Sequence, residues 1–94
     1  MLPLNNAMLR DLKARAQQLK PLLKVGKEGL TPEFFAALDA AFQNHPLLKV
    51  KFADLKEQKK ELTPQLAARS NSHLVTRVGN VVVLYRPASE AAAK

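Results

Sequence analysis

The chain has 94 residues, enough for one hydrophobic core and too few for two, so any function must lie on the surface of a single compact unit. Apolar residues make up 47% of the chain and charged residues 24%, a balance typical of globular proteins that excludes disorder over most of its length. Fifteen basic residues against eight acidic ones give a net charge of +7, which favours a polyanionic partner and, first among these, nucleic acid.

The first predicted element is a helix from Asn6 to about Leu19. Its apolar residues recur at helical spacing, and its polar side is strongly basic. Asn5 or Asn6 can cap its start, and Pro21 prevents its continuation. Most surface helices have a charged face, so this helix alone favours an RNA partner only slightly.

A short strand, a glycine-bounded turn and a helix start follow over residues 22–35. The apolar run 22–25 can form a buried strand, and Gly26 and Gly29 bracket a turn in which positive φ is cheap. Thr31 supplies a side-chain oxygen for an N-cap, and Pro32 suits the first helical position because no amide donor is needed there. The second helix is therefore predicted from Pro32 to about Asn44.

The turn Gly26-Lys27-Glu28-Gly29 has two interpretations. A Gly-x-x-Gly turn that leads to a helix N-terminus can lay exposed amides and the Lys27 ammonium along a phosphate backbone. Alternatively, it is a tight connection between strand and helix with a solvated lysine, because a four-residue glycine pattern is a weak signal by itself.

Residues 47–53 alternate as a strand with one buried face and one basic face, the latter formed by Lys49 and Lys51. A third helix is predicted from Leu55 to about Arg69, with Asp54 as its cap. Pro64 lies inside it after a threonine, which repeats the cap signal of the second helix. Either a kink near residue 63 or a helix that restarts at Pro64 would satisfy this pattern.

Residues 73–78 and 81–86 are predicted as two strands joined by Gly79-Asn80, a two-residue turn with glycine first, as type II′ prefers. Both faces of this hairpin are partly apolar, so each should be partly covered, and the first helix is free to cover one of them. Residues 1–87 are expected to form a single domain and residues 88–94 a short tail. The register expected for the hairpin pairs Val78 with Val81, Thr76 with Val83, and Leu74 with Tyr85.

The sequence offers little for catalysis or metal binding. Cysteine is absent, and the two histidines lie on different predicted elements. No nucleophile elbow or Walker loop occurs, and most acidic residues lie among lysines at helical spacing. We therefore expect no enzyme, no cofactor and no metal. The chain has no apolar stretch of about 18 residues and no leader pattern at its start, so we expect a soluble cytoplasmic protein with no membrane partner.

Four segments taken together resemble the CRM domain (chloroplast RNA splicing and ribosome maturation) in its free-standing bacterial form, the YhbY-like RNA-binding proteins. In order and spacing they cover nearly the whole chain except the tail. They are residues 19–21 (Leu-Lys-Pro), 25–31 (Val-Gly-Lys-Glu-Gly-Leu-Thr), 48–51 (Leu-Lys-Val-Lys) and 78–87 (Val-Gly-Asn-Val-Val-Val-Leu-Tyr-Arg-Pro). Two positions depart from the family pattern, Pro64 in the third helix and Arg77 in the hairpin.

The resemblance implies an α/β fold of the two-layer α+β kind, with three helices and a four-stranded mixed sheet, similar to the C-terminal domain of the third bacterial translation initiation factor. The expected order is helix, strand, helix, strand, helix, strand, strand. It also implies RNA binding through the Gly-x-x-Gly loop, and association with precursors of the large ribosomal subunit.

The mechanism that we expect is contact with RNA phosphates and not sequence-specific readout of bases. The glycines would let the backbone approach phosphates, and amides of the helix terminus would contact them. Small-molecule substrates are not expected, and the protein is expected to be a monomer. The predicted RNA-binding residues are Gly26, Lys27, Glu28 and Gly29 in the loop, with longer-range attraction from Lys13, Lys20, Lys24 and Arg86.

Two other functions remain open from the sequence. One is a protein-interaction module that docks on a ribosomal protein through the C-terminal hairpin, without direct RNA contact. The other is a hydrolase acting on nucleic acid, which is disfavoured because no cluster of acids for metal ions is visible.

Overall fold

The computed structural model describes residues 4–87 of the chain. The predicted tail, residues 88–94, lies outside the described residues, so the domain boundary at residue 87 stays a prediction. The predicted order of helices and strands is confirmed, with one short 3-10 helix inserted before the third helix. The elements are α1 (Asn6–Ala16), β1 (Leu23–Val25), α2 (Pro32–Asn44), β2 (Leu47–Phe52), η1 (Lys56–Gln58), α3 (Lys59–Arg69), β3 (His73–Val78) and β4 (Val81–Tyr85).

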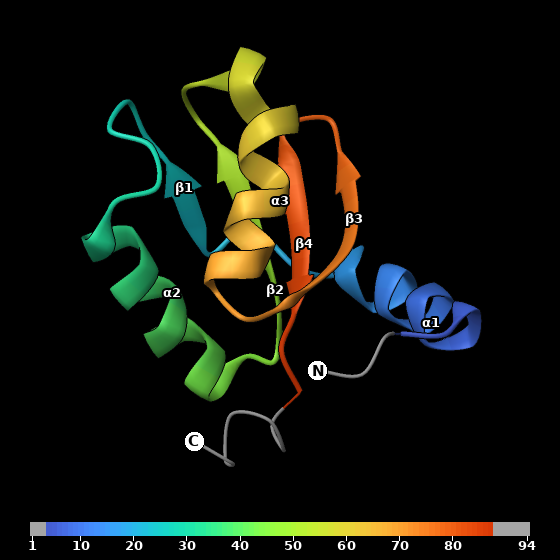
Figure 1. Cartoon of the computed structure of the whole chain (residues 1–94). Coiled ribbons are helices and arrows are strands. Elements are labelled where there is room, and N and C mark those ends of the chain that lie inside the picture. The colour runs from blue at the N-terminus through green and yellow to red at the C-terminus, as the bar shows by residue number, and fades with distance from the viewer. Residues whose placement is uncertain (1–3, 88–94) are drawn as a thin grey trace.

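The four strands form one mixed sheet in the order β1-β2-β4-β3. β1 and β2 are parallel, while β4 runs antiparallel to both of its neighbours. Helices α2 and α3 cover one face of the sheet, and α1 lies on the other (Figure 1). The predicted fold class is therefore confirmed, and α1 adds a partial third layer to the two that were expected.

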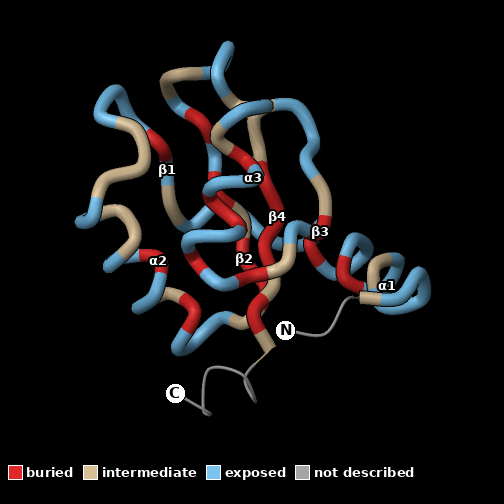
Figure 2. Tube along the Cα trace, viewed as in Figure 1, coloured by how far each residue is buried: buried red, intermediate tan, exposed pale blue. Residues whose placement is uncertain are grey.

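The main core lies between the sheet and the helices α2 and α3. Strand residues at alternate positions point into it, and Figure 2 shows buried residues along the strands. Leu38 and Phe42 from α2 and Leu66 from α3 complete it, each at most 2% exposed. A second, smaller cluster joins Leu12 and Ala16 of α1 to the opposite face of the sheet.

Helix α1 ends at Ala16 and not at the predicted Leu19, because the chain turns toward the sheet well before Pro21. The backbone N–H of Leu22 donates to the carbonyl of Lys49 (3.0 Å), and the Lys49 ammonium donates to the carbonyl of Leu19 (3.0 Å). These two bonds fix the link to β2. Leu22 itself lies outside β1, and its side chain is 49% exposed and not buried as predicted.

The predicted third helix begins later than expected. Leu55 has φ +56° and therefore lies outside any helix, and η1 separates it from α3. The predicted Asp54 cap is wrong, since Gln58 precedes α3. A restart at Pro64 is also wrong, because one helix runs from Lys59 to Arg69 and contains Pro64 in its interior.

The hairpin turn matches the prediction, but part of its register does not. Gly79 has φ +58° and Asn80 does not have positive φ, as in a type II′ turn. Val78 pairs with Val81 and Thr76 with Val83, as expected. Beyond them a bulge at residue 75 shifts the ladder, so Leu74 pairs with Leu84 and not with Tyr85. Because of this extra residue, Val75 joins the cluster under α1.

Candidate nucleic-acid interface

The Gly-x-x-Gly loop connects β1 to α2 as a closed turn. The N–H of Gly29 donates to the carbonyl of Gly26 (3.1 Å), and the N–H of Thr31 donates to the carbonyl of Gly29 (3.2 Å). Gly29 has φ +77°, and a Cβ placed there would lie 3.3 Å from the Leu55 side chain. The backbone conformation at Gly29 therefore accounts for this glycine without any ligand.

Gly26 is different, because nothing in the fold requires a glycine there. A Cβ built on Gly26 meets no atom within 4 Å, and its φ is not positive. Any small side chain would fit this backbone position. The absence of a side chain does, however, leave the backbone bare to an approaching ligand.

The tip of the loop carries unused hydrogen-bond donors. Within residues 4–87, no acceptor pairs with the backbone N–H of Lys27 or of Glu28. Both residues are exposed, as the pale blue colour of this loop in Figure 2 shows. Two adjacent free amides beside an ammonium group form a local arrangement that suits an anionic oxygen.

The start of α2 offers fewer free backbone amides to a ligand than the sequence predicted. Thr31 is the N-cap, and its Oγ1 accepts a hydrogen bond from the N–H of Phe34 (3.0 Å), as expected. Pro32 has no N–H, and the N–H of Phe35 donates to the carbonyl of Thr31. Among the described residues of the first turn of α2, only the N–H of Glu33 lacks an acceptor, and this residue carries a negative charge. The free amides available to bind an anion are therefore mainly those of the loop.

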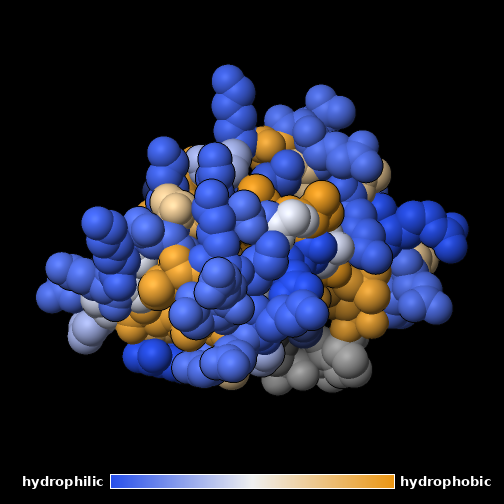
Figure 3. Space-filling view, turned by 90° about the horizontal axis from the view of Figure 1, so that it is seen from above, coloured by the Kyte–Doolittle hydropathy of each residue, from blue (hydrophilic) through white to orange (hydrophobic). Residues whose placement is uncertain are grey.

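The loop borders an open hollow of about 610 Å³ that it shares with the start of α2. Lys24 and Lys27 provide its positive charge, and Glu28 and Glu33 also line it. Seen from above, the end of the molecule with this loop and the β3–β4 turn is covered mainly by hydrophilic side chains (Figure 3). The charges at the loop are thus mixed, so its lysines need support from neighbouring cations to attract a polyanion.

Of the four cations predicted to act at longer range, only Lys24 lies beside the loop. Lys20 is exposed in the link between α1 and β1, and Lys13 is exposed on α1. The sequence-based prediction omitted Lys51, which pairs in register with Lys24 across β1 and β2. The sequence could have indicated Lys51, because the alternating pattern of β2 places Lys49 and Lys51 together on one face of the strand.

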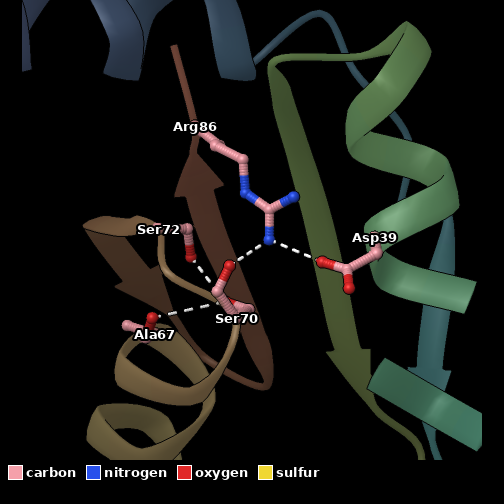
Figure 4. Close-up of polar contacts among 5 residues, drawn as sticks. All are labelled: Asp39, Ala67, Ser70, Ser72 and Arg86. Atoms are coloured by element: carbon pink, nitrogen blue, oxygen red, sulfur yellow. Dashed lines mark hydrogen bonds and ion pairs between the residues drawn. The ribbon is translucent and has the colours of Figure 1, made fainter. Parts of the chain in front are cut away.

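The prediction for Arg86 needs correction, because this side chain is only 3% exposed. Its Nη2 donates to Asp39 Oδ1 (2.7 Å) and to the carbonyl of Ser70, so it ties the end of β4 to α2 and to the end of α3 (Figure 4). The guanidinium carbon lies 4.4 Å from the centroid of the Phe42 ring. Arg86 is therefore a structural residue, unavailable to a ligand in this conformation.

Other kinds of site find no support in the part of the chain that the structure describes. No group of three His, Cys, Asp or Glu residues among positions 4–87 could hold a metal ion. None of the described helices is long and apolar enough to cross a membrane.

Comparison with known proteins extends over nearly the whole chain. Residues 4–86 match the model of the CRS1 / YhbY (CRM) domain family. A Haemophilus influenzae protein named "RNA-binding protein" is 34% identical over 92 residues, which cover 97% of this chain and 93% of that protein. The Bacillus subtilis protein named "Probable RNA-binding protein YqeI" is 32% identical, with 86% and 85% covered. The solution structure of a hypothetical Staphylococcus aureus protein superposes with a TM-score of 0.77 at 29% identity and covers 90% of each chain.

Proposed function

The chain belongs to the CRS1 / YhbY (CRM) domain family, and from this premise we propose that it binds RNA through phosphate contacts at the Gly-x-x-Gly loop. The relatives named above are called RNA-binding proteins, which supports the proposal. The family is one of RNA-binding proteins and not of enzymes, in agreement with the expectation from the sequence.

The observation that carries the proposal is the bare backbone at Gly26 beside two free amides. An RNA phosphate that approaches Gly26 can accept hydrogen bonds from the N–H groups of Lys27 and Glu28. The ammonium groups of Lys24 and Lys27 add positive charge, while the carboxylates of Glu28 and Glu33 in the same hollow oppose it. Binding of this kind contacts the RNA backbone and does not by itself distinguish one base sequence from another.

The partner that we propose is ribosomal RNA within a precursor of the large ribosomal subunit, and the compartment is the cytoplasm. This proposal extends the resemblance noted in the sequence. With an excess of seven positive charges, a monomer can attract RNA from a distance before the loop makes its contacts.

A protein-interaction module is the second candidate, because the hairpin exposes apolar side chains. Val78 is 69% exposed and Leu74 is 42% exposed, on opposite faces of β3. A ribosomal protein could cover either one. Such a module would need no phosphate contact and would bind with little dependence on salt.

The test is a titration with a ribosomal RNA fragment at several salt concentrations. Each phosphate contact should contribute about −0.7 to the slope of log K against log salt for single-stranded RNA, so four to six contacts give about −3 to −4. A flat dependence on salt would overturn the phosphate mechanism and favour the protein-interaction module.

A further inference from the structure

The face of the sheet that carries α1 has an open apolar pocket beside the end of this helix. Its volume is about 470 Å³, within the usual range for small-ligand sites. The walls are largely aliphatic and come from three parts of the chain that are far apart in sequence. They include Ala16, Pro21, Thr76, Val78, Val81 and Val83.

The geometry of this pocket is fixed by bonds between the link and β2. Lys49 accepts from the Leu22 N–H through its carbonyl and donates to the Leu19 carbonyl through its ammonium, both at 3.0 Å. These bonds hold Pro21 against the pocket. A ligand would therefore meet a largely preformed cavity and pay little for ordering it.

The charged residues that line the pocket are basic. Lys13 and Lys49 line it, and no acidic residue of the described chain does. Gln17 also lines it and brings an amide that can both donate and accept hydrogen bonds. Aliphatic walls, one amide and two lysines suit the face, the edge and the flanking phosphates of a nucleotide.

One row of paired residues crosses the sheet between the Gly-x-x-Gly loop and the pocket. Lys24 on β1 is level with Lys51 on β2, which is level with Val81 on β4 and then Val78 on β3. Neighbouring strands lie about 4.8 Å apart, so Lys24 and Val81 are separated by about 10 Å. Lys24 and Lys51 are both exposed and can contact the phosphates of an RNA strand that runs from the loop to the pocket.

We propose that this pocket receives an unpaired base of the RNA strand whose phosphates the loop binds. The inference rests on the proposed function and adds a preference for single-stranded segments. A base in a duplex is stacked on both sides and cannot enter, whereas an unpaired base can lay its face on Val78 and Val81. Gln17 contacts the edge of this base, and Lys49 and Lys51 contact the adjoining phosphates.

The test compares two oligomers of the same length and charge, a uridine octamer and an octamer of abasic ribose phosphate. The wild-type protein should bind the uridine octamer about three- to tenfold more tightly, because only that oligomer gains contacts from a base. In the double variant Gln17→Ala/Val78→Ala this ratio should fall toward one, with affinity for the abasic octamer unchanged. The matched control is Leu74→Ala, an exposed apolar residue on the same strand but on the opposite face.

The outcomes separate this inference from the proposed function. Equal binding of both octamers by the wild-type protein would overturn the base pocket and leave phosphate binding intact. The same ratio in the double variant and the wild type would also overturn it. The occupant of the pocket would then be an apolar segment of a partner protein. Failure to bind either octamer or a ribosomal RNA fragment would instead overturn the proposed function.

Discussion

Lys27 and Arg86 are both cations near the end of a strand, but they lie in regions of opposite character. Within the described residues, the Arg86 guanidinium contacts Asp39, Ser70 and Phe42, and its side chain is 3% exposed. Lys27 pairs with no other group within residues 4–87 and lies in an exposed loop with free amides. A positive charge in this chain therefore stabilises the fold in one region and is available to a ligand in the other, and only the surroundings decide which.

The largest effect on stability is expected at Arg86. Arg86→Ala removes the donor to the Ser70 carbonyl and leaves a void over Phe42, so unfolding free energy should fall by about 2–4 kcal/mol. Chemical denaturation measures this loss. Lys27→Ala is the control and should change stability by less than about 0.5 kcal/mol. An Arg86→Ala protein that is as stable as the wild type but binds RNA weakly would place Arg86 at the interface.

The two glycines of the loop also differ in this way, since Gly29 is needed by the fold and Gly26 is open to a ligand. Gly29→Ala forces a side chain into φ +77° and against Leu55, so stability should fall by about 1–2 kcal/mol. Thermal melting checks this. A Gly29→Ala protein with an unchanged midpoint would mean that the turn has another conformation.

Gly26→Ala should leave the melting midpoint unchanged or raise stability by up to about 1 kcal/mol, since the added methyl group meets no atom and restricts the unfolded chain. RNA affinity should nevertheless fall, because the methyl group keeps a phosphate away from the backbone. Melting and titration of the same preparation test both halves. Unchanged affinity would show that no ligand approaches Gly26.

Local signals in the sequence were sufficient for the region around the loop. Thr31 and Pro32 define the start of α2 through bonds within four residues, and Gly79 defines the hairpin turn in the same way. Such features depend on neighbours in sequence, so the sequence alone could predict them.

Features that depend on distant neighbours were missed. The burial of Arg86 requires Asp39, which is 47 positions away, and no spacing in the chain indicates this pair. No turn residue indicates the bulge at Val75, and the residues of α1 that Val75 packs with are far from it in the sequence. Lys49 and Lys51 were recognised as a basic strand face, but the place of Lys49 in the lining of an open pocket depends on where α1 ends.

The most direct test of the phosphate-binding loop is a charge reversal at Lys27 compared with one at Lys94, which lies outside the family-matched residues 4–86. Lys27→Asp and Lys94→Asp change the net charge identically, so a general attraction between protein and RNA is weakened equally in both. Each variant is melted first and then titrated with a ribosomal RNA fragment at one fixed salt concentration. Both should melt like the wild type, within about 0.5 kcal/mol. We predict a much larger loss of affinity for Lys27→Asp, and equal losses in the two variants would contradict a binding role for the loop.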